Sequence, residues 1–331
     1  MGPHAPPPMT GYLHLPPLWV MDQFDHRNPS ANHVDQHADM TSAADMVWAA
    51  SISDDIAICF ARDGFVSFVY ADHAEVGGSG NDHEILADRI SLANAHIACL
   101  HSAMAIVDQT SSEGDAITHL TAVHSTDSGM SANDPVTRAL LSLPPGRQLN
   151  PWCIGSHAHV ETTWVPFRHP VSREAVKDSV DRLTALAAGG IDRIRRYEML
   201  LHAGVALQEG NYSLALITAS ALAEHAAVRL WQQQARDIGG GAGGIVANDA
   251  FNRLGAGHLL RLLRMSGAVP EALYLDLDRT RCARNKWAHG LEVPAADVVA
   301  VSQKAAAWSM AIADGLNFIV WPTLTLGGWT F

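Results

Sequence analysis

The sequence predicts an α+β N-terminal domain followed by an all-α helical bundle, and three observations lead to this fold class. Short β-prone runs alternate with helical patterns before residue 170, whereas the apolar residues after it recur only at helical spacing. Residues 1–170 carry 6 basic and 19 acidic side chains, and residues 171–331 carry 16 and 15. Of the 18 histidines, 14 lie in the first part. We therefore predict a histidine-rich, acidic domain over residues 1–170, a helical domain over 171–321 and an apolar tail over 322–331.

The first half opens with an arm rich in Pro, His, Asp and Asn, and regular elements follow it. Two β-prone runs, Ile56 to Ala61 and Phe65 to Tyr70, flank the sequence Arg62-Asp63-Gly64, and the Asp-Gly pair favours a hairpin turn. Apolar residues then keep i+3/i+4 spacing from Leu86 to Val107, which predicts a long helix. Weaker patterns predict a strand from Ile117 to His124 and a helix from Val136 to Leu143.

Histidines in the first half raise the question of a metal site. His33, His37 and Asp39 have spacings that a metal ion could bridge. His157 and His159 would project from one face of a strand. No third, distant ligand accompanies either group, so we expect polar histidine-rich surfaces and no bound metal or other cofactor. A metal-dependent activity of this half stays open as an alternative, and it predicts stoichiometric zinc in the purified protein.

Several classes of protein are disfavoured by what the chain lacks. No lysine precedes Lys177, so the first half has no Walker-type phosphate loop. Ile238 to Gly244 contains five glycines without a Gly-Lys-Ser/Thr sequence, which predicts a flexible connector. The four cysteines form no CxxC pair, which fits reduced thiols. Because the sequence shows neither a signal peptide nor an uninterrupted apolar run of about 18 residues, we expect a cytoplasmic protein that does not span a membrane.

The second half reads as a succession of helices. Ser172 can cap a helix that runs to about Ala187. A further helix is predicted from Ile191 to Gln208, and Asn211 caps a long alanine-rich helix after it. A last helix follows Pro294, and its apolar stripe is expected to close the bundle. That stripe consists of Val298, Val301, Ala305, Trp308, Ile312, Leu316 and Ile319.

The most informative stretch is Arg284-Asn285-Lys286-Trp287-Ala288-His289-Gly290. If residues 271–289 are helical, Arg284 projects from an apolar stripe and must find a partner there. Glu224, in the middle of the alanine-rich helix, is a candidate partner for Arg284 or His289, and a surface position for Glu224 is equally open. His289 lies at the helix end, where the negative end of the macrodipole favours its protonated form. The stripe comprises Leu273, Leu277, Thr280 and Trp287.

These side chains fit the transesterification of RNA. Arg284 can meet the negative charge that develops on a phosphate, with Asn285 orienting either it or the histidine. His289 can help the 2′-OH to attack or protonate the leaving 5′-oxygen, and this chemistry requires no metal. Because only RNA carries that hydroxyl, the expected substrate is RNA rather than DNA. The bare spacing is a weak signal, since Arg253 and His258 repeat it.

The surroundings of this stretch strengthen the signal. The sequence RNKWAHG, preceded by the alanine-rich helix and followed by another apolar-periodic helix, resembles the HEPN family of all-helical domains. The family motif is an arginine, a polar residue that is commonly asparagine, a short spacer and a histidine. Arg284, Asn285 and His289 match these positions. The resemblance covers roughly residues 190–320 and says nothing about the first half.

The resemblance carries expectations about activity and partners. Many members look like metal-independent endoribonucleases that act as toxins or antiphage effectors, and they dimerise so that two motifs face one another. It therefore implies an RNA substrate, a homodimer with a composite active site, and an antitoxin or regulatory protein as a further partner. Other members have lost the chemistry and serve as nucleotide-binding or protein-binding modules, which is the alternative function here.

Residues near the motif are expected to support it. Arg279, Arg281, Arg284 and Lys286 form the densest basic group in a protein of net charge −12, so RNA contact is expected to be local. We assign supporting roles to Arg281, Lys286 and Glu224. His258, on a helical stripe with Leu262 and Met265, is expected to be either a core histidine or an auxiliary site residue.

Overall fold

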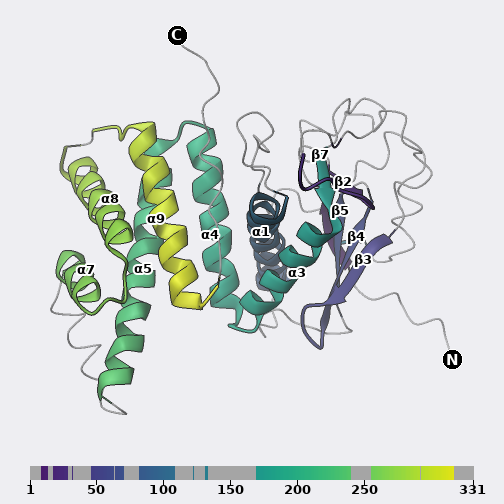
Figure 1. The fold of residues 1–331 in the computed structure, drawn as a ribbon, viewed down its shortest axis with the longest axis horizontal. Coiled ribbons are helices and arrows are strands. Elements are labelled where there is room, and N and C mark those ends of the chain that lie inside the picture. The colour runs from purple at the N-terminus through teal and green to yellow at the C-terminus, as the bar shows by residue number, and fades with distance from the viewer. Residues whose placement is uncertain are drawn as a thin grey trace, which may run out of the picture. The chain divides into compact units, whose positions relative to one another are not determined.

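The protein is described by a computed structural model. The described residues are 9–13, 18–28, 32, 46–62, 64–70, 82–108, 122, 131–132, 169–239, 255–290 and 292–316. Among them the β-strands precede most of the helices, and the C-terminal part is helical throughout (Figure 1). The coarse prediction, an α+β part followed by a helical part, is confirmed.

Contacts divide the chain into two compact units, Met1–Glu198 and Met199–Phe331, and the division falls within α4 (Ile191–Gln208). α3 (Arg173–Ala187) belongs to the first unit because it packs chiefly against α1 (Asp82–Val107). The composition change near residue 170 therefore does not coincide with this division. Composition describes which residue types a segment contains. The unit to which a helix such as α3 belongs depends instead on which neighbouring element covers its apolar face.

The first unit contains a five-stranded antiparallel sheet with strand order β3-β4-β5-β1-β6. The hairpin predicted at Asp63-Gly64 joins β4 to β5 with the expected bounds, and Gly64 has a φ of 79° that favours glycine. A parallel pair, β2 with β7, lies beside Gly64, where an added Cβ would be 2.7 Å from the Leu18 Cβ. The strands are β1 (Met9–Leu13), β2 (Leu18–Met21), β3 (Met46–Ser51), β4 (Ile56–Ala61), β5 (Phe65–Tyr70), β6 (Ser131–Ala132) and β7 (His169–Ser172).

Helix α1 forms the centre of this unit, as its continuous apolar pattern predicts. His96, fully buried on it, has its Nε2 3.2 Å from the Ser179 hydroxyl of α3 and lies edge-on to Phe60 and Phe68. The segment Ala87–Val107 is long and apolar enough to cross a membrane, and 78% of its apolar stretch is buried inside the structure. The core helix of a folded domain has the same length and composition.

Several predictions for the first half fall outside the described residues. They include the candidate metal ligands His33, His37 and Asp39, the pair His157 and His159, and almost all of the strand from Ile117 to His124. The helix from Val136 to Leu143 and the tail over residues 322–331 also lie outside. Within the described part of the chain, no three His, Cys, Asp or Glu side chains group together in a way that could hold a metal ion.

The junction between β7 and α3 contains a buried carboxyl group. The Ser172 hydroxyl accepts a hydrogen bond from the Ala175 amide at 3.0 Å, which confirms the predicted N-cap. The Ser172 amide in turn donates to the buried Asp108 carboxylate at 3.0 Å. Burial raises the pKa of Asp108 to about 6 from 3.8, although the Ser172 hydrogen bonds and the nearby His26 lower it. His26 lies 3.9 Å from both Asp108 and Glu174.

Replacement of Asp108 by asparagine is expected to remove a pH dependence of stability. Between pH 4 and 6 the folded protein binds more protons at Asp108 than the unfolded chain does, so the free energy of unfolding falls as pH rises through this window. The fall attributable to this group is roughly 2 to 3 kcal/mol. Urea unfolding of wild type and Asp108→Asn at several pH values measures the difference in slope. Glu174→Gln, which alters an exposed carboxylate facing the same His26, should change the slope only slightly, because Glu174 is the smallest of the influences on the pKa of Asp108. Equal slopes for Asp108→Asn and wild type would contradict the assignment.

Among the described residues, the second unit comprises the C-terminal part of α4 and the helices α5, α7, α8 and α9. The Asn211 side chain accepts a hydrogen bond from the Leu214 amide at 3.3 Å and so caps α5, as predicted. α5 extends through Gly239, so the first two residues of the predicted glycine-rich connector are helical. α9 ends at Gly315, whose φ is 66°. The helices are α5 (Tyr212–Gly239), α7 (Ala256–Met265), α8 (Glu271–Gly290) and α9 (Ala296–Asp314).

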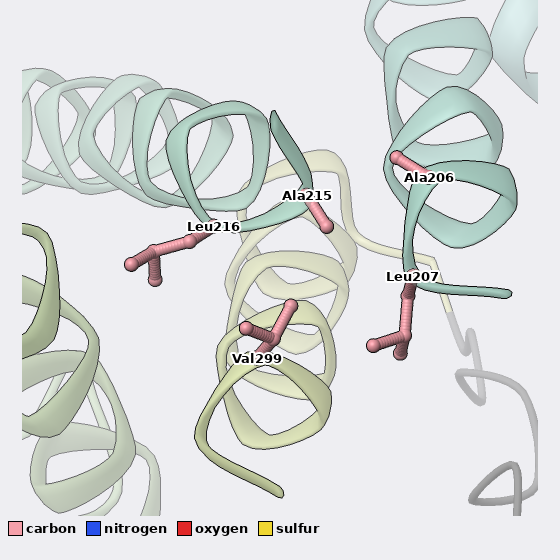
Figure 2. Close-up of a cluster of buried hydrophobic side chains, with 5 residues drawn as sticks. All are labelled: Ala206, Leu207, Ala215, Leu216 and Val299. Carbon is pink, nitrogen blue, oxygen red and sulfur yellow. The ribbon is translucent and has the colours of Figure 1, made fainter. Parts of the chain in front are cut away.

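A hydrophobic cluster lies where α4, α5 and α9 meet (Figure 2). It consists of Ala206, Leu207, Ala215, Leu216 and Val299. Two side chains of α8, Ala283 and Trp287, pack against it. The cluster therefore anchors the part of α8 that carries the Arg-Asn-x3-His sequence.

The buried face of α9 differs from the predicted stripe. Trp308 is 38% exposed and Val298 and Val301 are only half-buried, whereas Val299, Ala306 and Met310 are buried. α9 is apolar on most of its circumference, so periodicity could not select the face. The buried residues of α9 are mostly small Ala and Ser side chains, which allow the close packing of this helix against its neighbours, α5 above all.

Candidate functional site

Helix α8 is oriented by the apolar stripe that its sequence predicts. Leu273, Leu277 and Thr280 are buried, and the helix spans Glu271–Gly290 as expected. Trp287 continues this face, and its indole Nε1 donates a hydrogen bond to the Ser213 hydroxyl of α5 at 2.9 Å. Arg284 lies within the same turns and is thereby held toward α5.

Arg284 is paired with Glu224 across the α5–α8 contact. One guanidinium nitrogen, Nη2, donates to the Glu224 Oε1, so the predicted partner is present. The two side chains are 35% and 42% exposed, which leaves the pair accessible to a ligand. A partly exposed pair of this kind contributes about 0 to 1 kcal/mol to stability, so a phosphate can compete with Glu224 for the arginine.

A cavity of about 400 Å³ beside this pair collects cationic side chains from two helices. α8 contributes Arg281, Arg284 and Asn285, and α7 contributes Arg261 and His258. The first residues of α7 also line the cavity. The N-cap of this helix is Gly255, so no capping side chain accepts a hydrogen bond from the first amides of α7. Because the start of a helix presents amide donors and the positive end of its dipole, this wall attracts anions as well.

The charge of the cavity is locally positive in an acidic protein. Arg281 is bound by Asp278, whose Oδ1 lies 3.0 Å from Nε and 2.7 Å from Nη2. This hydrogen bond raises the pKa of Arg281 further, so the guanidinium stays charged. Asp278 thus contacts Arg281, and Glu224 contacts Arg284. Arg261 adds a third positive charge to the cavity. The cavity is suited to bind a phosphate group.

The two histidines occupy different places. His289 is exposed near the end of α8 and is not among the residues that line this cavity. His258 does line it and is exposed, so it is not the core histidine that was one of its expected roles. Lys286 is also exposed and lies outside the lining. Among the described residues, the imidazole that shares the cavity with Arg284 is therefore that of His258.

A second cavity of about 290 Å³ adjoins the cationic one. The two share Gly255, Ala256, Arg281 and Arg284, and the second is lined otherwise mainly by small and aliphatic side chains of α5, α7 and α8. Ser220 of α5 lines it, and no sequence pattern marked this residue, since a serine on an alanine-rich helix has no distinctive spacing.

Together the two cavities offer a cationic surface, the imidazole of His258 and an apolar recess within the second unit. Comparisons of the chain with models of protein families, with curated proteins and with solved structures found no match.

Proposed function

We propose that the second unit is a metal-independent endoribonuclease of HEPN type. The observation that carries the proposal is the cavity in which Arg261, Arg281, Arg284 and Asn285 lie together with His258. Three guanidinium groups at the start of a helix suit a phosphodiester, and the His258 imidazole adds a hydrogen-bonding group beside them. The resemblance of the Arg284 to His289 stretch to the HEPN motif supports the same function.

The proposed reaction is the transfer of the phosphodiester to the neighbouring 2′-hydroxyl. The 2′-oxygen attacks phosphorus and loses its proton to a base, while the bond from phosphorus to the 5′-oxygen breaks and that oxygen receives a proton. The products are a 2′,3′-cyclic phosphate and a free 5′-hydroxyl. Stabilisation of the charge on the phosphoryl oxygens and proton transfer account for the acceleration, and neither needs a metal ion.

Each residue has a role in this proposal. Arg284 binds the phosphate in the transition state, His289 transfers a proton, and Asn285 orients one of these two side chains. Arg281, Lys286 and His258 support the binding of the RNA backbone, and Glu224 holds Arg284 in place until the substrate arrives. Because His289 is exposed, it is accessible to the site of a second copy, in line with a homodimer whose active site is composite.

The biological setting is part of the proposal. A nuclease with a narrow cationic site suits a cytoplasmic toxin or antiphage effector that an antitoxin or regulatory protein restrains. The acidic first half would then serve as a sensing or inhibitory region.

Incubation with cellular RNA tests the proposal. Purified protein should cleave RNA in the presence of EDTA, leave 2′,3′-cyclic phosphate ends, and spare DNA of the same sequence. A DNA oligonucleotide with a single ribonucleotide should be cut only there, since only that residue carries the nucleophile. Absence of turnover, or cleavage of all-DNA strands, would overturn the assignment.

The two histidines are distinguished in the same assay. His289→Ala is expected to lower the cleavage rate by about 10²- to 10⁴-fold, the usual contribution of a general acid or base. His258→Ala should have a smaller effect, mainly on RNA binding. If His258→Ala abolishes turnover and His289→Ala does not, the proton-transfer role belongs to the imidazole inside the cavity.

A noncatalytic binding module is the second candidate function. The ion pair between Arg284 and Glu224 favours it, together with the position of His289 outside the cavity lining. It predicts saturable binding of a nucleotide or partner protein and no RNA turnover at any protein concentration.

A further inference from the structure

The apolar cavity next to the cationic one has an internal feature that points to a ligand. Ser220 is only 4% exposed, lines the cavity, and its hydroxyl has no hydrogen-bond partner in the structure. A buried hydroxyl without a partner costs about 1 to 3 kcal/mol. A ligand that enters the cavity and hydrogen-bonds to Ser220 would remove this cost.

The polar groups elsewhere on the wall differ from Ser220. The Thr280 hydroxyl already donates to the Asp276 carbonyl at 2.8 Å. Glu224 and Arg284 are paired with one another at the boundary of the two cavities. The Ser220 hydroxyl is therefore the buried polar group of this wall without a partner, and it meets a ligand when the side chain rotates toward the cavity, because the oxygen has almost no accessible surface in its present position. The remaining surface is suited to a flat apolar group.

The two cavities share their boundary, so one ligand can occupy both. Arg281 and Arg284 line each of them, and a phosphate bound to these arginines would place its attached group at the mouth of the apolar cavity. A nucleotide has this combination, an anionic phosphate joined through a sugar to a flat, largely apolar base with hydrogen-bonding edges.

We propose that the apolar cavity is a nucleobase subsite, in which one base of the RNA lies between α5, α7 and α8 and hydrogen-bonds to the Ser220 hydroxyl. This inference rests on the proposed phosphate-binding role of the cationic cavity. The subsite would select the nucleotide next to the scissile linkage, because a base that cannot pair with Ser220 leaves that hydroxyl buried and unsatisfied.

Binding of small ligands to the full chain tests the subsite separately from cleavage. By calorimetry, adenosine 5′-monophosphate should bind about 10- to 100-fold more tightly than ribose 5-phosphate, since base burial is worth about 1 to 3 kcal/mol. Ser220→Ala should weaken binding of the nucleotide about tenfold and leave ribose 5-phosphate binding unchanged. The same substitution should not lower the unfolding midpoint, because it removes an unpaired hydroxyl.

The second variant fills part of the apolar cavity. Ala223→Val adds two methyl groups to a buried residue of the lining and should reduce nucleotide affinity to that of ribose 5-phosphate. Ala221→Val, on the exposed side of the same helix, should bind both ligands like wild type.

The outcomes separate the two proposals. Equal affinity for both ligands, or a nucleotide preference that survives both Ser220→Ala and Ala223→Val, overturns the base subsite and leaves the phosphate site standing. Nucleotide binding that both variants weaken supports the subsite, whereas an affinity for adenosine equal to that for adenosine 5′-monophosphate would remove the phosphate site on which the subsite rests. No binding of either ligand overturns both.

Discussion

Arg284→Ala is expected to reduce the rate of RNA cleavage by about 10²- to 10³-fold, the usual effect of removing one preorganised donor from a charged transition state. The guanidinium of Arg284 lines the cavity, and its ion pair with Glu224 is partly exposed to solvent. Because such pairs stabilise proteins little, the substitution should change the free energy of unfolding by less than about 1 kcal/mol. Single-turnover cleavage of a defined RNA measures the loss.

Two further variants sharpen this result. Arg284→Lys should recover only part of the activity, because lysine keeps the charge but not the planar fork of donors. Arg279→Ala removes an exposed arginine from the same helix that does not line the cavity, and it should cleave like wild type. If Arg279→Ala and Arg284→Ala lose activity equally, the effect is one of general positive charge, and the role assigned to Arg284 is wrong.

The Arg284→Ala protein also tests the composite site. Mixed with the His289→Ala protein under conditions of subunit exchange, it should regain about a quarter of wild-type activity, since half of the dimers would contain one intact site. Neither variant alone should be active. No recovery in a mixture that demonstrably forms heterodimers would show that each site is built from one chain.

Arg229→Ala is expected to destabilise the second unit by about 3 to 5 kcal/mol, because it removes the arginine that pairs with a buried carboxylate. The guanidinium of Arg229 on α5 pairs with Asp314 at the end of α9, and the Asp314 side chain has no exposed surface. Nearby, the Gln233 side chain donates to the Ala313 carbonyl at 3.1 Å. Urea unfolding followed by helical circular dichroism measures the loss.

Matched variants identify the cause of this destabilisation. Arg236 lies about two turns further along α5, is exposed, and donates from Nε to the Gln232 carbonyl of the same helix. Arg236→Ala should therefore lower the free energy of unfolding by less than about 0.5 kcal/mol. The double variant Arg229→Met, Asp314→Leu should recover most of the lost stability, because neither charge then remains buried. A loss below 1 kcal/mol for Arg229→Ala would mean that water reaches Asp314 readily.

Local sequence patterns predicted the helices of the second half and one hairpin of the first half closely. The helix after Ser172, the helix from Ile191 to Gln208 and the hairpin at Asp63-Gly64 have the expected bounds. Caps, turns and periodic apolar residues act within a few residues of one another, so their signals are readable without the fold.

The same patterns identified Arg284 and Glu224 as candidate partners, yet other members of the site were not readable from them. The burial of Ser220 and the position of His258 in the cavity with Arg284 depend on how α5, α7 and α8 pack. The orientation of α9 was also not readable, because several of its faces are apolar and only the fit of small side chains against α5 selects one.

By itself the sequence determined the bounds of the β4–β5 hairpin and of most helices, and which residue types could bind a phosphate and move a proton. It did not predict β1, β2, β3, β6 or β7, and it indicated an irregular arm where β1 and β2 lie. Only the tertiary structure decided that Arg284 meets Glu224 sixty positions away, that His258 rather than His289 lines the cationic cavity, and that α3 packs with α1. Periodicity shows which side of a helix is apolar. The residues that cover that side come from distant parts of the chain, and which residues these are depends on the packing of the whole unit.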